Sequence, residues 1–218
     1  MHNYNQVIEL APRFVEAYVN RGAAYAKQRL FEKAKRDLNQ ALSLSPDDPE
    51  ILFNRGRLYQ FIGEYEQALL DYGAAIQKDS KYVDAYVNRG SLYGTIREFN
   101  SAYEDFQKAI DLAPSDPQAY YNRGILYWDM LEIDKALADM NKVLSLNPNL
   151  TNALLNRGSL YSLQGNFANA LSDYDRAIRL NPEDPQGYGL RSLLHDRMGN
   201  SEAAQMDAEK AVRLENRQ

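Results

Sequence analysis

The chain has 218 residues, with 25 lysines and arginines against 30 aspartates and glutamates, which gives a formal net charge of −5 at pH 7. This mild acidity argues against a nucleic-acid-binding protein, which would carry a basic patch, and the 44% hydrophobic and 25% charged fractions are ordinary for a folded soluble chain. Because the chain has no cysteine, disulfides, thiolate catalysis, iron–sulfur clusters and cysteine-bound zinc are excluded.

The sequence holds no group of residues that predicts catalysis, a metal site or a cofactor. Its two histidines, His2 and His195, are too few and too far apart for a histidine metal site or a catalytic triad. It also has no glycine-rich phosphate loop and no nucleophile elbow. No stretch approaches 18 uninterrupted apolar residues, and residues 1–10 lack the charged start and apolar run of a signal peptide. We therefore expect a non-enzymatic, cytoplasmic protein without a membrane span.

The first predicted element is a helix within residues 1–14. Tyr4 and Ile8 lie four residues apart, which is helical spacing, and Pro12 follows them. These residues stand in the same register as the closing helix of the segments that come after them. We interpret residues 1–14 as the second helix of a truncated repeat.

From residue 15 onward the sequence repeats with a period of 34 residues. The tripeptide Asn-Arg-Gly recurs in phase, a tyrosine follows each glycine by three residues, and an alanine follows it by twelve. The tripeptides begin at Asn20, Asn54, Asn88, Asn122 and Asn156. In-phase copies of this kind predict a solenoid of stacked structural units.

Each copy predicts two helices joined by a short turn. In the second copy, apolar residues at helical spacing continue as far as Ile62. A turn follows at Gly63 and Glu64, and the helical spacing of apolar residues begins again at Tyr65. Asp-Pro pairs then supply an N-cap acceptor and a proline in the first turn of the next helix. These pairs are Asp48-Pro49, Asp116-Pro117 and Asp184-Pro185. Small residues such as Gly56 and Ala68 let the two helices approach closely.

These residues resemble the tetratricopeptide repeat family, whose pattern places a large apolar residue, Gly and Tyr in the first helix and Ala, an aromatic and Ala in the second, closed by Pro. The resemblance implies an all-α fold: a right-handed superhelical solenoid of antiparallel helix pairs, with six full repeats plus an N-terminal half repeat. First helices would line the concave face. The implied division of the single domain 1–218 is the half repeat 1–14 and the repeats 15–48, 49–82, 83–116, 117–150, 151–184 and 185–218.

Copy six departs most from this pattern. Ser192 replaces the packing glycine, and Gly187 and Gly189 stand in the first helix, where each glycine costs about 0.8–1 kcal/mol relative to alanine. We therefore expect copy six to be the least stable unit.

The arginine of each copy is matched by an aspartate sixteen residues later. The pairs are Arg21 and Asp37, Arg55 and Asp71, Arg89 and Asp105, Arg123 and Asp139, Arg157 and Asp173, and Arg191 and Asp207. Because the planar guanidinium suits a carboxylate, we predict an ion pair that joins the two helices of each unit. The alternative, an arginine row that binds an acidic ligand, leaves the aspartates unexplained.

The asparagines of the five tripeptides predict a row of amides on one face. Asparagine is a mediocre helix former in mid-helix, but its amide can both donate to and accept from the backbone of an extended peptide. The row resembles the asparagine ladder of the family member O-GlcNAc transferase. We therefore predict peptide binding by Asn20, Asn54, Asn88, Asn122 and Asn156. In the alternative interpretation, each amide only bonds a neighbouring backbone and orders the stack.

Neighbouring positions predict two anchors for such a peptide. Tyr121, Ile125 and Trp128 form an apolar patch in copy four, and Phe53 with Arg57 forms a second anchor in copy two. The family's clamp for the carboxylate of a chaperone tail is not expected, because most of its basic positions are occupied by other residues.

The sequence thus favours a non-enzymatic scaffold that binds an extended peptide or partner protein in the concave groove, with no nucleic acid as partner. Two alternatives stay open. The chain could assemble with itself through open solenoid ends, which would expose Tyr4, Ile8, Val212 and Leu214. It could instead be the regulatory arm of a larger enzyme.

Overall fold

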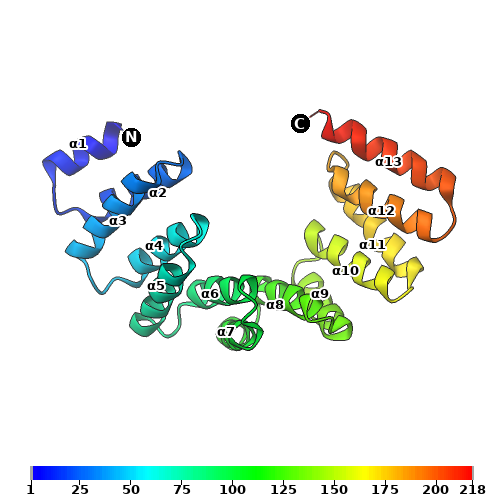
Figure 1. Ribbon diagram of the computed structural model, residues 1–218, viewed down its shortest axis with the longest axis horizontal. Coiled ribbons are helices and arrows are strands. Elements are labelled where there is room, and N and C mark those ends of the chain that lie inside the picture. Colours follow the sequence, from blue (N-terminus) through cyan, green and yellow to red (C-terminus); the bar gives the residue numbers. More distant parts are fainter. Residues whose placement is uncertain (1, 218) are drawn as a thin grey trace. The chain divides into compact units, whose positions relative to one another are not determined.

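The computed structural model describes residues 2–217, and within them it contains only α-helices and the turns between them (Figure 1). The helices are α1 (His2–Leu10), α2 (Val15–Lys27), α3 (Phe31–Leu44), α4 (Pro49–Phe61), α5 (Tyr65–Lys78), α6 (Val83–Thr95), α7 (Phe99–Leu112), α8 (Pro117–Asp129), α9 (Ile133–Leu146), α10 (Thr151–Leu163), α11 (Phe167–Leu180), α12 (Pro185–Arg197) and α13 (Ser201–Glu215). The all-α prediction is confirmed. Met1 and Gln218, the ends of the expected single domain, lie outside the described residues.

Consecutive helices pack as pairs, and the chain forms two compact units, Met1–Ala113 (unit 1) and Pro114–Gln218 (unit 2). In unit 1, α2 packs on α3, α4 on α5 and α6 on α7. In unit 2 the pairs are α8 with α9, α10 with α11 and α12 with α13. Within each unit, the second helix of one pair packs on the first helix of the next, as α5 does on α6 and α11 on α12.

The Asp-Pro pairs begin helices as predicted. Asp48 Oδ1 accepts a hydrogen bond of 2.9 Å from the backbone N–H of Glu50, and Pro49 stands in the first turn of α4. Asp116 and Asp184 cap α8 and α12 in the same way. These carboxylates satisfy N–H groups that have no partner inside their own helix.

The turn inside each pair places one residue in the left-handed backbone region. Glycine occupies this position at Gly63, Gly165 and Gly199, but Arg29, Arg97 and Leu131 adopt φ values of 60°, 64° and 61°. A side chain is strained in this region, and glycine is not.

Replacing Leu131 by glycine is expected to stabilise the protein by about 0.5–1 kcal/mol. The change removes the strain at φ 61°, the lost side chain is 80% exposed, and the greater freedom of glycine in the unfolded chain offsets part of the gain. The measurement is chemical denaturation followed by far-UV circular dichroism. The matched variant Gly165→Leu, at φ 76° with open space around it, should lose a similar amount; a destabilised Leu131→Gly protein would contradict the interpretation.

The helix pairs approach closely where the repeat places its small residues. A Cβ atom on Gly56 would lie 2.9 Å from the ring of Tyr72, and one on Gly158 would lie 2.7 Å from Tyr174. Ala68 and Ala170 are fully buried beside them. The glycine and alanine of the repeat are therefore packing residues.

The predicted arginine–aspartate pairs are present in every copy. Each aspartate is buried and accepts two hydrogen bonds, from Nε and Nη2 of its arginine, as in Arg157 and Asp173 at 2.8 and 2.7 Å. The bonds from Arg21, Arg55, Arg89, Arg123 and Arg191 to their aspartates measure between 2.7 and 2.8 Å. These bonds raise the pKa of Arg157 and of the arginines at 21, 55, 89 and 191 above the ordinary value. The arginines are already paired with aspartates of the same chain, so the row has the structural role that was predicted.

The same arginines also tie neighbouring repeats together, which the sequence analysis did not anticipate. Arg55 Nη1 donates a 2.7 Å hydrogen bond to Asn39 Oδ1 on the preceding second helix, and Arg157 Nη1 donates to Asn141 at 2.8 Å. Gly73 occupies the corresponding position before Arg89. Within the described residues, Arg89 bonds Asp105 and lies over the rings of Tyr86 and Tyr93, but it has no hydrogen bond to the preceding repeat.

Copy six is better packed than its sequence suggests. A Cβ atom on Gly187 would lie 2.9 Å from Ile178, so this glycine permits a close contact between α12 and α11. Ser192 Oγ donates a 2.7 Å hydrogen bond to the carbonyl of Ala204. The sequence indicated the helix-propensity cost of Gly187 but did not show its contact with Ile178. The lower stability of copy six stays a prediction.

The terminal helices bury some of the residues named for the self-assembly alternative and leave other apolar residues exposed. Leu214, expected to be exposed, is only 2% exposed because α13 turns it onto α12. Ile8 packs against the cluster of Tyr18, Ala41 and Ile51. Of the four residues named for an open end, Val212 is 55% exposed.

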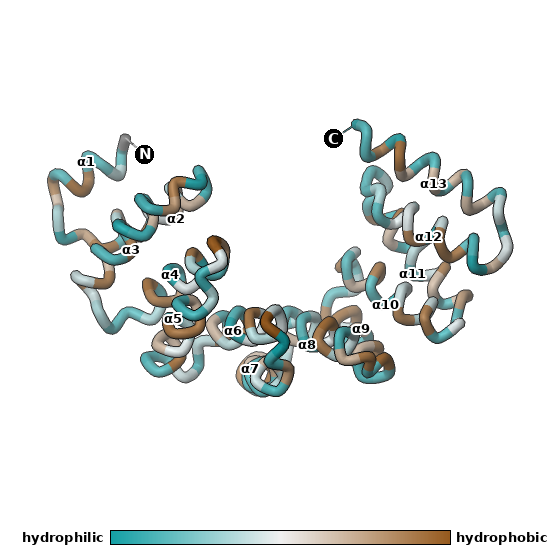
Figure 2. Tube along the Cα trace, viewed as in Figure 1, coloured by the Kyte–Doolittle hydropathy of each residue, from teal (hydrophilic) through white to brown (hydrophobic). Residues whose placement is uncertain are grey.

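Apolar and polar residues alternate along the helices, as the brown and teal segments of Figure 2 show. Within residues 2–217, none of the helices combines the length and the apolar character that crossing a membrane requires.

Candidate functional site

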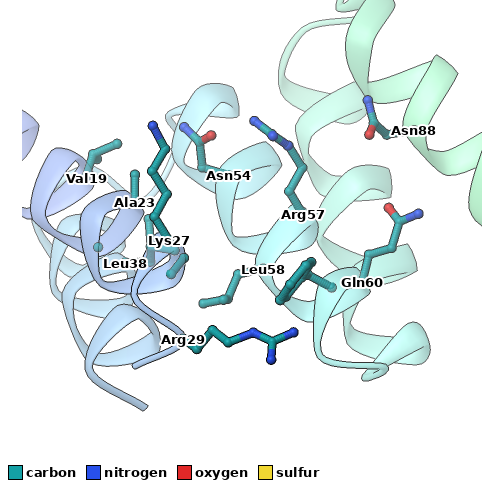
Figure 3. A pocket seen from close by; sticks show the side chains of 13 residues that line it. Val19, Ala23, Lys27, Arg29, Leu38, Asn54, Arg57, Leu58, Gln60 and Asn88 are labelled. Carbon is teal, nitrogen blue, oxygen red and sulfur yellow. The ribbon is translucent and has the colours of Figure 1, made fainter. Parts of the chain in front are cut away.

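Unit 1 contains a pocket of about 630 Å³ between the first helices of successive pairs (Figure 3). Val19, Ala23 and Leu58 supply apolar walls, and Asn54 and Asn88 contribute amides from α4 and α6. Two members of the predicted asparagine row therefore line one pocket, and Arg57, the partner of Phe53 in the predicted anchor, lines it with them.

The two asparagines differ in their hydrogen bonds. Asn88 Nδ2 donates to the backbone carbonyl of Asp84 at 2.8 Å, one turn back in α6, as the stack-ordering alternative expects. Its Oδ1 accepts no hydrogen bond from the described part of the chain. Asn54 is half-buried, and neither end of its amide is bonded within residues 2–217. The pocket thus offers a ligand the complete amide of Asn54, together with the oxygen and the second N–H of Asn88.

Three cations surround this pocket. Lys27 ends α2, Arg29 follows it in the turn, and Arg57 stands on α4. Figure 3 shows Lys27 and Arg57 extending in the same direction on either side of Asn54. Among the described residues that line the pocket there is no aspartate or glutamate.

The predicted anchor of Phe53 and Arg57 is corrected by the structure. Phe53 is only 7% exposed, because its ring packs against Tyr72 and Tyr82, with ring centroids 5.8 and 5.0 Å away. The Arg57 guanidinium lies over this ring, 5.7 Å from its centroid. The Phe53 ring therefore packs against the Arg57 guanidinium and is not available for contact with a ligand. Burial raises the pKa of Tyr82 to about 12, so this phenol stays neutral.

A second pocket of about 410 Å³ adjoins the first and shares Val19 with it. It contains Asn20, another member of the predicted row, which is exposed. Its charged lining consists of one arginine, Arg13, and the three acids Glu16, Asp48 and Glu50. These two pockets therefore have linings of opposite net charge.

In unit 2 the predicted site residues are partly used by the protein itself. Asn156 Nδ2 donates a 3.0 Å hydrogen bond to Tyr121 Oη, so these two predicted residues satisfy one another. Burial raises the pKa of Tyr121. Tyr121, Ile125 and Trp128 are half-buried and pack together against the core of unit 2, while Asn122 is also half-buried. The three residues of the predicted apolar patch therefore pack on the same core, and each exposes only part of its side chain.

Sequence reasoning missed the contributions of Lys27, Arg29 and Phe61 to the first pocket. They lie at the ends of α2 and α4, outside the central turns that carry the asparagine row. The available signal was the basic pair beside the turn of the first copy. Within residues 2–217, no group of three or more His, Cys, Asp or Glu side chains could hold a metal ion.

The helix pairs and their packing define a helical repeat protein. Tetratricopeptide repeat profiles match residues 15–48, 117–150 and 151–184, and also 38–69 and 185–218, while a TPR repeat profile matches 62–96 and 98–130. The chain belongs to the tetratricopeptide repeat family, a family of protein–protein interaction scaffolds.

Solved structures show the same fold. PilF of Pseudomonas aeruginosa is 22% identical with a TM-score of 0.80, and the match covers 92% of this chain and 91% of that one. YrrB, described as a TPR protein with an unusual peptide-binding site, is 21% identical with a TM-score of 0.62, over 84% and 95% of the two chains. A chain of the Cut9–Hcn1 hetero-tetramer of APC/C is 15% identical with a TM-score of 0.81; the match covers 99% of this chain but 43% of that chain. Curated protein sequences give no match.

Proposed function

We propose that the protein is a scaffold that binds an extended peptide segment of a partner protein, and that the first pocket of unit 1 is the principal site. The observation that carries this proposal is the meeting of Asn54 and Asn88 in one open pocket of about 630 Å³. The repeats 15–48, 49–82 and 83–116 each contribute a first helix to this region.

The chemistry of the pocket suits a peptide backbone. The Asn54 amide can donate to a peptide carbonyl and accept from a peptide N–H, and the Asn88 oxygen can accept a second N–H. Val19 and Ala23 give apolar contact for the side chains between these bonds. The peptide-binding site in the description of YrrB, whose fold this chain shares, supports the proposal. Asn20, in the second pocket of unit 1, belongs to the same predicted row. Within unit 2, Asn122 and Asn156 of that row, with Tyr121, Ile125 and Trp128, stay predicted peptide contacts.

Replacing Asn54 and Asn88 together by alanine is expected to weaken peptide binding by about tenfold, because hydrogen bonds with net values of ~0.5–1.5 kcal/mol each are lost. The probes are peptides selected on the full chain from a random decapeptide display library, and their affinity is measured by fluorescence anisotropy. Thermal stability should change little, because Asn54 holds no other group of the described chain in place.

The control variant is Asn152→Ala, which removes an exposed asparagine from α10, a first helix of unit 2, outside the predicted row. Peptides that depend on the first pocket should bind this variant as tightly as the unaltered protein. Unchanged affinity of the Asn54→Ala/Asn88→Ala protein, together with a clear loss of stability, would instead support the stack-ordering alternative.

A further inference from the structure

The charges around the first pocket are unusual for this chain. The protein has a net charge of −5, yet Lys27, Arg29 and Arg57 line this pocket without an acidic neighbour in the lining. A pocket lined by one sign of charge attracts ligands of the opposite sign.

These three cations also lack ion-pair partners. Elsewhere in unit 1, Lys35 pairs with Glu32 and Glu64, and the arginines of the repeat are held by buried aspartates. Within the described residues, Lys27, Arg29 and Arg57 pair with no carboxylate. Arg57 is instead held from below by the ring of Phe53, so its guanidinium is positioned and its N–H groups remain available.

We propose that the first pocket selects a peptide segment that carries at least two acidic side chains. This inference rests on the proposed function and names the class of partner. Three unpaired cations exceed the single charge of a chain terminus, whereas two or more aspartates or glutamates along an extended segment neutralise most or all of their charge. Planar guanidinium groups and the Asn54 amide together suit a carboxylate and the backbone beside it.

The charge of the second pocket determines which way the acidic segment lies along unit 1. Glu16, Asp48 and Glu50 outnumber Arg13 there, so an acidic segment is repelled from it and held at the first pocket. The bound segment therefore has its acidic side chains over α2 and α4 near Lys27 and Arg57, and neutral or basic side chains toward Val15 and Glu16.

The test compares two selections from one random decapeptide display library, one on the full chain and one on its Lys27→Met/Arg57→Met variant. Methionine keeps an unbranched apolar side chain at each position and removes the charge. Peptides selected on the unaltered chain should be enriched in Asp and Glu, and those selected on the variant should not. A selected peptide whose two acids are changed to Gln should bind the unaltered chain about tenfold more weakly at 50 mM salt, and the difference should shrink at 300 mM salt because screening weakens charge attraction.

The matched control is Arg13→Met, which removes one positive charge beside the second pocket and should leave the acidic enrichment unchanged. Binders that require Asn54 and Asn88 but show no acidic enrichment would overturn this inference and leave the proposed function intact. A selection that yields no binder above background would overturn both. Equal acidic enrichment on the Lys27→Met/Arg57→Met variant would also overturn this inference, since other residues would then select the acidic side chains.

Discussion

Replacing Asp173 by alanine is expected to destabilise the protein by about 3 kcal/mol. The Asp173 side chain is 6% exposed and accepts two hydrogen bonds from Arg157, whose own side chain is 20% exposed. Removing the carboxylate leaves a largely buried guanidinium without its counter-charge, and breaking a buried pair in this way costs about 3–5 kcal/mol. We place the expected loss at the low end because the arginine retains some contact with water and its bond to Asn141. Chemical denaturation gives the measurement.

The neighbouring variant Asp175→Ala provides the control. Asp175 also bonds an arginine, Arg191, but its side chain is 42% exposed and Arg191 keeps Asp207. Its loss should cost only about 0.2–1 kcal/mol, as for exposed pairs. If both aspartate variants lose the same free energy of unfolding, burial does not explain the contribution of the Arg157–Asp173 pair to stability. The double replacement Arg157→Met/Asp173→Leu should recover part of the loss, since no unpaired charge remains.

The same Gly→Ala change is expected to have opposite effects at two helical positions of unit 2. At Gly158 the new Cβ would lie 2.7 Å from Cε1 of Tyr174, a ring that is 2% exposed and held through its hydroxyl by Ser159. Overpacking of this kind costs about 1–3 kcal/mol and outweighs the helix propensity of alanine. We expect a net loss of about 1–2 kcal/mol.

At Gly189 nothing lies within 4 Å of the new Cβ, so only the propensity gain of about 0.8–1 kcal/mol remains. The two variants should therefore differ by about 2–3 kcal/mol in their free energies of unfolding. Denaturation of both proteins in one buffer checks this difference. A stabilised Gly158→Ala protein would show that Tyr174 can move, and the glycine would then not be required for packing.

The features that the sequence predicted well depend on one repeat alone. The bonds between arginine and aspartate join positions sixteen residues apart within a helix pair, and the Asp48 cap needs only the next three residues. Such local geometry repeats wherever the residues repeat. The helices, their pairing and the packing glycines could be predicted for the same reason.

The features that the sequence missed depend on how helices and turns pack against one another. Phe53 is buried because its ring packs against Tyr72 on α5 and Tyr82 just before α6, and the frame position of Phe53 alone does not show this. The cations of the first pocket come from the end of one helix and the middle of another, so their meeting requires the packing of α2 beside α4. Likewise Asn156 is bonded to Tyr121 through contact between successive first helices.

The position of the single tryptophan has a consequence for spectroscopy. Trp128 packs against the core of unit 2, whereas unit 1 contains tyrosines and phenylalanines but no tryptophan. Its fluorescence therefore reports on unit 2, while the far-ultraviolet dichroism of the helices reports on both units. In a stack where each repeat contacts only its neighbours, segments can open one after another. Comparing the two optical signals during denaturation thus separates the opening of unit 2 from that of the whole chain without any label.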